Sequence, residues 1–151
     1  MSITLRPPRL SELPELSALC LRSKAHWGYD ATFLEACRAE LTLTEAHLDN
    51  PMIVAVLGEA TAGVAAISLQ KDEAEIDLLF IEPALMGRGL GRRLMLWCRD
   101  AARHAGARRL LIQSDPQAEG FYRRMGARRI GVRPSASVPG RDLPLLACAL
   151  R

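Results

Sequence analysis

Residues 86–93 read Met-Gly-Arg-Gly-Leu-Gly-Arg-Arg and give the clearest indication of the fold. Three glycines in five positions let the backbone bend so that successive N–H groups converge. Apolar residues at helical spacing follow, which predicts a helix from Gly91 to about residue 105. The start of that helix adds unpaired N–H groups and the positive end of its dipole, and Arg88, Arg92 and Arg93 surround it. This combination is what a diphosphate group requires.

Two common phosphate-binding motifs do not fit this stretch. A P-loop needs a Gly-Lys-Ser/Thr sequence, which does not follow these glycines. The dinucleotide fingerprint needs the spacing GxGxxG, whereas Gly87, Gly89 and Gly91 lie two residues apart. A Rossmann fold also places its glycines after the first strand, and several strands are expected before this loop.

The residues before the glycines predict a largely antiparallel sheet. Hydrophobic runs with β-branched residues predict strands at 2–6, 52–57, 63–69 and 74–81. In the strand at 74–81, alternation places Ile76, Leu78 and Phe80 on one face. Glu75, Asp77 and Leu79 then lie on the opposite face. Two helical regions are expected after the first strand, one capped by Ser11 and reaching about residue 25, the other over 30–41.

The residues after the glycines predict a strand at 108–114, a helix from Asp115 to Met125, and strands at 127–132 and 143–150. A loop rich in Pro, Ser and Gly, at 133–142, separates the last two strands. The order is therefore β-α-α-β-β-β-α-β-α-β-β, with a βαβ crossover after the fourth strand. This pattern predicts an α/β sandwich.

The composition places the chain among ordinary globular proteins. Its 151 residues favour a single domain, 1–151, and 49% of them are hydrophobic and 25% charged. No apolar run approaches the roughly 20 residues of a membrane span, and the first residues lack a basic and apolar signal segment. We therefore expect a soluble, cytoplasmic protein without a membrane partner.

The four cysteines, at 20, 37, 98 and 148, include no CxxC pair. Each lies in an apolar stretch, which favours buried thiols in a reducing compartment over catalysis or metal binding. We therefore expect no metal site and no covalent cysteine intermediate.

Charge is unevenly distributed along the chain. Residues 1–82 carry 6 Lys/Arg against 13 Asp/Glu, whereas residues 83–151 carry 14 against 4. A basic half can bind a polyanion, or its arginines can simply solvate helix faces. Because no aromatic residues are interleaved with the arginines and no helix-turn-helix pattern is present, we expect no nucleic-acid partner.

Two motifs resemble those of the GCN5-related N-acetyltransferase (GNAT) superfamily. Met86-x-x-Gly89-x-Gly91 is similar to the family's Gln/Arg-x-x-Gly-x-Gly/Ala, with Met at the first position. The second motif reads Asp115-x-x-Ala118-x-x-Phe121-Tyr122-x-x-x-Gly126-Ala127. It is similar to the family's Asn-x-x-Ala-x-x-Leu/Phe-Tyr-x-x-x-Gly-Phe, with Asp115 in place of the usual Asn. The resemblance implies a GNAT-like α/β sandwich over nearly the whole chain. Such a fold has a mixed, mostly antiparallel sheet of about seven strands, helices on both faces, a bulged fourth strand and splayed fourth and fifth strands.

The resemblance implies that acetyl-CoA is the cofactor and lies in the gap between the splayed strands. The backbone of Leu79, Phe80 and Ile81 would pair with its pantetheine arm, and the freed N–H of Leu79 or Phe80 would point at the thioester carbonyl. The glycine-rich loop would hold the pyrophosphate. The full set of implied cofactor-binding residues is Leu79, Phe80, Ile81, Met86, Gly87, Arg88, Gly89, Leu90, Gly91, Arg92, Asp115, Ala118 and Phe121.

Three residues are candidates for catalysis. Tyr122 aligns with the family's tyrosine near the cofactor sulfur, where a phenol can protonate the departing thiolate; alternatively, its ring only packs in the core. Glu75 lies eleven residues before Met86, the register of the glutamate base in some members of the family. Asp77 shares its face, and two close carboxylates raise one pKa. The pair could instead only bind a cationic substrate.

Members of the family build the acceptor site from the first two helices and the loop between the last two strands. The segment His26-Trp27-Gly28-Tyr29 lies at the first location and fits either a pocket wall, with His26, Trp27 and Tyr29 against the substrate, or an anchored loop. Arg141 lies at the second, where it could bind a substrate carboxylate or remain a solvated charge.

The resemblance therefore predicts an N-acetyltransferase that moves an acetyl group to a primary amine by direct attack in a ternary complex. A small amine or an amino acid is the expected acceptor, and a homodimer is possible. The alternative is a non-catalytic module that senses acyl-CoA.

Overall fold

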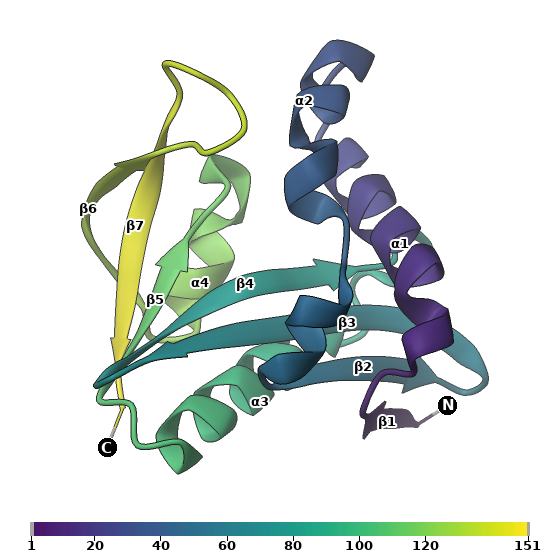
Figure 1. The fold of residues 1–151 in the computed structure, drawn as a ribbon, viewed down its shortest axis with the longest axis horizontal. Coiled ribbons are helices and arrows are strands. Elements are labelled where there is room, and N and C mark those ends of the chain that lie inside the picture. Colours follow the sequence, from purple (N-terminus) through teal and green to yellow (C-terminus); the bar gives the residue numbers. More distant parts are fainter. Residues whose placement is uncertain (1, 151) are drawn as a thin grey trace.

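The computed structural model describes residues 2–150, which form a seven-stranded mixed sheet in the order β1-β2-β3-β4-β5-β7-β6 (Figure 1). Every neighbouring pair is antiparallel except β4 and β5. The mixed α/β sheet confirms the predicted fold class. The strands are β1 (Ile3–Arg6), β2 (Met52–Leu57), β3 (Ala60–Gln70), β4 (Glu73–Ile81), β5 (Arg109–Gln113), β6 (Arg128–Pro134) and β7 (Asp142–Ala149).

Helices cover both faces of the sheet (Figure 1). On one face, α1 (Leu13–Ala25) and α2 (Ala31–Leu41) pack over β3 and β4 through a cluster that includes Leu16, Cys20 and Leu78. On the other, α3 (Leu90–His104) and α4 (Glu119–Arg124) enclose the larger cluster around Leu94 and Met95, which are both 0% exposed. All four cysteines are buried free thiols, as their apolar context predicted. Short 3-10 turns lie at Leu10–Glu12, Glu45–Asp49, Pro83–Leu85 and Pro116–Ala118.

The start of α1 differs from the expected serine cap. Glu12, rather than Ser11, closes the first turn: its carboxylate accepts the backbone N–H of Arg9 at 2.7 Å and the guanidinium of Arg6 at 2.9 and 2.6 Å. The hydrogen bond from Arg6 lowers the pKa of Glu12 to about 2. A carboxylate that reaches back three residues caps the turn more strongly than a hydroxyl, because it is charged.

A β-bulge in β4 creates the gap in the sheet. Ala66 of β3 opposes Leu78 and Ile67 opposes Ile76, so Asp77 is the extra residue of β4. The predicted alternation is therefore wrong across this point: Ile76 packs with the α3 cluster, whereas Leu78 packs with the α1 cluster. Beyond the bulge β4 also leaves β5, since the two strands pair only over residues 73–75 of β4. The splay that the resemblance implied is present.

Other boundaries shift by a few residues. The turn between β2 and β3 is only Gly58 and Glu59, so β3 begins three residues before the expected strand. The expected helix at 115–125 is divided into a 3-10 turn and α4. Between residues 2 and 150, none of the helices combines the length and the apolar character needed to cross a bilayer.

Candidate active site

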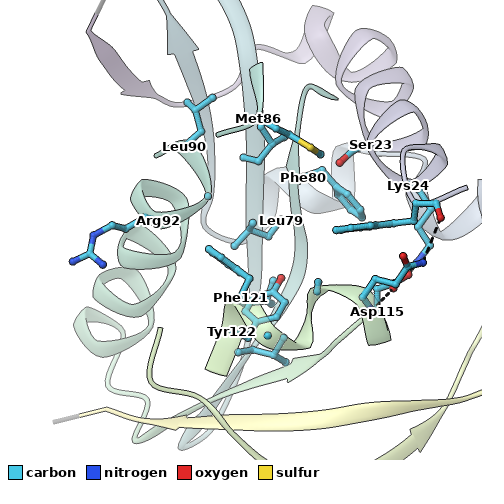
Figure 2. Close-up of a pocket in the computed structure, with 18 of the residues that line it drawn as sticks. Ser23, Lys24, Leu79, Phe80, Met86, Leu90, Arg92, Asp115, Phe121 and Tyr122 are labelled. Carbon is cyan, nitrogen blue, oxygen red and sulfur yellow. Dashed lines mark hydrogen bonds and ion pairs between the residues drawn. The ribbon is translucent and has the colours of Figure 1, made fainter. Parts of the chain in front are cut away.

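A cavity of about 590 Å³ occupies the gap between the splayed strands, and its size suits a small-molecule ligand (Figure 2). Its walls come from β4 beyond the bulge, the glycine-rich loop, the start of α3, the end of β5, α4 and the end of α1. The lining residues are Ser23, Lys24, Trp27, Ile76, Asp77, Leu79, Phe80, Ile81, Met86, Gly87, Gly89, Leu90, Gly91, Arg92, Ile112, Gln113, Asp115, Gln117, Ala118, Gly120, Phe121, Tyr122 and Arg124.

The glycine-rich loop presents backbone N–H groups without acceptors. Met86 donates to the carbonyl of Pro83 at 3.3 Å, and Arg93 donates to that of Gly89 at 3.1 Å. Among the described residues, none of the amides over 87–92 between them donates to another backbone carbonyl. Gly87 and Gly89 adopt φ of +81° and +80°, a left-handed conformation that turns successive amides towards one side. These six N–H groups at a helix start fit the diphosphate of coenzyme A.

Gly91 fits the cavity wall for a steric reason. A Cβ at this position would lie 3.3 Å from two ring carbons of Phe121, so a larger residue would displace that ring. Phe121 in turn packs edge-on against Tyr122, with ring centroids 5.1 Å apart. Arg92 and Met86 line the cavity, whereas the side chain of Arg88 is exposed and does not line it.

The backbone of β4 faces the gap at alternate residues. Glu82 donates to Ala62 of β3 at 2.8 Å, and by the two-residue period of a strand Phe80 also directs its amide towards β3. The amides of Leu79 and Ile81 consequently point away from β3, into the side that β5 has left. Of the two amides considered for the thioester carbonyl, that of Leu79 therefore has the suitable direction.

Tyr122 lies at the floor of the cavity. Its side chain is buried, but its hydroxyl has no hydrogen-bond partner among residues 2–150 and points into the cavity (Figure 2). Burial raises the pKa of Tyr122 well above its ordinary value. The phenol consequently stays protonated at neutral pH and is able to donate a proton.

A second cavity of about 330 Å³ adjoins the first on the α1 and α2 side of β4. The two cavities share lining residues on α1, β4 and β5, among them Lys24, Asp77 and Phe80. The lining residues of the second cavity are Lys24, Glu40, Leu41, His47, Glu75, Ile76, Asp77, Phe80, Gln113 and Leu143. Across residues 2–150, no three or more His, Cys, Asp or Glu side chains gather in a way that could hold a metal ion.

The two candidate bases differ in their surroundings. Glu75 lines only the second cavity and forms an ion pair with Arg133 at 2.7 Å. Asp77 lines both cavities, and its carboxylate accepts a hydrogen bond from the hydroxyl of Ser68 at 3.1 Å. The surrounding protein displaces water from Asp77 and raises its pKa; Glu75 adds to the effect, while the Ser68 hydroxyl opposes it. Of the two carboxylates, only that of Asp77 lines both cavities and is free of an ion pair among residues 2–150.

Asp115, the departure from the second motif, is the centre of a polar cluster. It pairs with Lys24 at 2.8 Å (Figure 2) and accepts a hydrogen bond from the hydroxyl of Tyr29 at 2.8 Å. Arg141 donates to the same Tyr29 hydroxyl at 2.8 Å, and the Tyr29 ring stacks on Phe33 with centroids 4.0 Å apart. Burial opposes the charge on Asp115, but the hydrogen bonds from Lys24 and the backbone outweigh it and hold its pKa below the ordinary value.

The residues expected around the acceptor do not all reach a cavity. Trp27 lines the first cavity and is 37% exposed. His26 is exposed and packs edge-on against Trp27, and Tyr29 and Arg141 belong to the Asp115 cluster rather than to either lining. The cluster instead joins α1, the segment before α2, the end of β5 and the β6–β7 loop across the top of the site.

Several lining residues were missed from the sequence. Ser23 is 5% exposed and continues the apolar stripe of Leu16, Leu19 and Cys20 on α1. A polar residue in an apolar stripe was the signal that could have found it. Lys24, Gln113 and Arg124 carried no comparable signal, because their place in the site depends on how distant elements meet.

A sheet that splays beyond a bulge, over a glycine-rich helix start, defines a GNAT-type α/β fold. The family model described as an acetyltransferase (GNAT) domain matches residues 15–136, and the chain belongs to this family. No protein of curated function matches the sequence.

Solved structures of the family share the fold along the whole chain. PaiA N-acetyltransferase from Thermoplasma acidophilum, in complex with coenzyme A, has a TM-score of 0.77 at 18% identity, with 99% of each chain covered. A GCN5-related N-acetyltransferase from Rhodopseudomonas palustris has a TM-score of 0.81 at 19% identity, with 99% of this chain and 97% of that chain covered. The protein yncA from Salmonella typhimurium, with its cofactor acetyl-CoA, has a TM-score of 0.72 at 21% identity, with 100% of this chain and 95% of that chain covered. At these identities the likeness establishes the fold.

Proposed function

We propose that this protein is an acetyl-CoA-dependent N-acetyltransferase that acetylates a small primary amine by direct attack in a ternary complex. One observation carries the proposal: six amides without an acceptor among residues 2–150 lie at one end of a cavity, and the Tyr122 hydroxyl, which has no partner in the same range, lies at its floor. The similar structures that contain coenzyme A or acetyl-CoA support it.

The cofactor would be held by backbone groups. The amides of residues 87–92 would receive the diphosphate, with Arg92 and Arg124 on the lining as counter-charges. The free edge of β4 at Leu79 and Ile81 would pair with the amides of the pantetheine arm. Acetyl-CoA supplies the acetyl group as a thioester, whose carbonyl carbon is open to an amine. Met86 stands where the family motif has Gln or Arg. This difference would remove one side-chain contact to the cofactor and leave the backbone contacts in place.

Three groups would act on the reacting atoms. Asp77, at the junction of the two cavities, takes a proton from the acceptor ammonium, directly or through water. The amine nitrogen then forms a bond to the carbonyl carbon while the N–H of Leu79 stabilises the charge on the oxygen. The C–S bond breaks, Tyr122 gives its proton to the sulfur, and the surplus proton from the nitrogen restores the phenol. The products are an N-acetylamine, coenzyme A and one released proton.

Titration calorimetry with coenzyme A tests the binding step. We expect saturable one-to-one association with the folded protein. Ligand at 100 times its Kd should stabilise the fold by about 2.7 kcal/mol, which corresponds to a rise in Tm of ~5–10 °C for a chain of this size. Absence of binding by a folded sample would refute the proposal. Binding without transfer to any amine would instead identify the alternative function, a sensor of acyl-CoA.

The pH dependence of the reaction tests the base. Because burial raises the pKa of Asp77, we expect kcat/KM to fall at acidic pH with a midpoint above the ordinary aspartate value, as protonation removes the acceptor of the proton. Asp77→Asn should lower kcat/KM about tenfold at neutral pH and abolish this acidic limb. Glu75→Gln is the matched control, since Glu75 is paired with Arg133, and it should keep the acidic limb of the pH profile. If Glu75→Gln lost this limb and Asp77→Asn kept it, Glu75 would be the base and Asp77 would not.

A further inference from the structure

The second cavity has a lining that is apolar in the middle and charged at its sides. Leu41 on α2, Phe80 on β4 and Leu143 on β7 supply aliphatic and aromatic surface. Lys24, Glu40, Glu75 and Asp77 supply four formal charges, three of them negative. A ligand of this cavity therefore meets more negative than positive charge.

Two of the four charges already form ion pairs within the protein. Lys24 is paired with Asp115 at 2.8 Å, and both side chains are largely buried, at 14% and 9% exposure. Asp115 also lies 3.7 Å from the guanidinium of Arg141, so Lys24 shares this carboxylate with a second cation. Glu75 is paired with Arg133 at 2.7 Å.

The two remaining charges are both carboxylates. Asp77 accepts only the neutral hydroxyl of Ser68, and Glu40 makes no ion pair with any residue among 2–150. His47 also lines the cavity, and its Nδ1 accepts the backbone N–H of Thr44 at 3.0 Å. Of the Asp115 cluster only Lys24 enters this lining, and Cys37 does not.

The position of each carboxylate distinguishes their roles. Asp77 lines both cavities and therefore lies where the acceptor nitrogen must meet the acetyl group. Glu40, near the end of α2, lines the second cavity alone, away from the cofactor side. Between them lies the apolar surface of Leu41, Phe80 and Leu143.

We propose that the acceptor is a small aliphatic diamine, with one nitrogen at Asp77 and the second, as an ammonium group, at Glu40. This inference rests on the proposed acetyltransferase function and adds its substrate class. The nitrogen at Asp77 loses a proton and forms the amide, the thioester C–S bond breaks, and coenzyme A leaves as the thiol. The nitrogen at Glu40 keeps its charge throughout, so the product is a mono-N-acetylated diamine.

Three acceptors with four carbons each test the proposal: 1,4-diaminobutane, 1-aminobutane and 4-aminobutanoate, whose far ends are an ammonium, a methyl and a carboxylate group. We expect kcat/KM for the diamine to exceed that for the monoamine about tenfold, the effect of one charged hydrogen bond, with the amino acid the poorest of the three. Equal or better use of the monoamine or of 4-aminobutanoate would overturn the proposal.

Substitution of Glu40 tests the second contact. In Glu40→Gln the ratio of kcat/KM between diamine and monoamine should fall to near one, and in Glu40→Lys 4-aminobutanoate should overtake the diamine. Glu35→Gln, on an exposed part of the same helix and outside both linings, should keep the original ratio. A ratio unchanged in Glu40→Gln would overturn the assignment.

Calorimetry of 1,4-diaminobutane into protein saturated with coenzyme A separates this inference from the proposed function. Binding of coenzyme A without binding or preferred use of the diamine would overturn the diamine site alone. Failure to bind coenzyme A would overturn the proposed function as well.

Discussion

Tyr122→Phe will lower kcat for acetyl transfer by about 10²- to 10³-fold, the usual contribution of a positioned general acid. The departing thiolate of coenzyme A must gain a proton, and the Tyr122 hydroxyl is a protonated donor at the cavity with no hydrogen-bond partner among residues 2–150. The change removes one oxygen atom and leaves the ring against Phe121. Steady-state kinetics at saturating acetyl-CoA and amine measures the loss.

Two controls separate this chemical role from a structural one. The Tyr122 hydroxyl makes no hydrogen bond among the described residues. Its removal should therefore leave the Tm of the protein nearly unchanged and the Kd for coenzyme A within about twofold of the original value. Tyr29→Phe removes the only other phenol of the chain, and should lower kcat less than tenfold. The loss in Tyr122→Phe should also shrink with an acetyl thioester of a more acidic thiol, which needs less help to leave. An undiminished kcat would show that Tyr122 is only a packing residue.

The fold could be predicted because its decisive signals are local. The positive φ angles at Gly87 and Gly89 favour residues without a Cβ, and the helix begins at Leu90, directly after them. The strands and helices on either side were predicted to within a few residues for the same reason: turn residues and hydrophobic period lie next to each other in the sequence.

The bulge could not be predicted from alternation. Residues 78–81 are all apolar, so the pattern is the same whether Asp77 is paired or extra, and Ile76 was placed on the wrong face. Only the register with β3 shows where the extra residue lies. The insertion of β7 between β5 and β6 is likewise a matter of pairing between distant segments.

The residues expected to bind the cofactor lie together in the structure, whereas those expected around the acceptor do not. Most of the former come from two continuous motifs and line the first cavity. The second cavity, which we propose for the acceptor, draws Glu40 from α2, His47 from a 3-10 turn, Asp77 from β4 and Leu143 from β7. Lys24 and Asp115 form an ion pair although they lie 91 residues apart in the sequence, and no local sequence pattern indicates this pair.

The second large effect concerns the glycine-rich loop. Gly89→Ala should raise the Kd for coenzyme A about 30- to 100-fold. An L side chain at φ of +80° is strained by roughly 1–2 kcal/mol, so the backbone at the start of α3 will turn away and withdraw amides from the diphosphate. Each charged hydrogen bond lost costs about 1.5–3 kcal/mol. Calorimetry with coenzyme A gives the change in Kd.

Gly106, at the opposite end of α3, provides a matched control. It has a φ of +92°, and a Cβ there, as at Gly89, would meet nothing within 4 Å. Gly106→Ala therefore imposes similar strain and a similar loss of stability, but far from the cavity, and its Kd for coenzyme A should stay within twofold of the original. S-acetylpantetheine, which lacks the diphosphate, should be used equally well by Gly89→Ala and the unaltered protein. If Gly106→Ala weakened coenzyme A as much as Gly89→Ala did, the loss would reflect general destabilisation, and the amides at 87–92 would have no special part in binding the diphosphate.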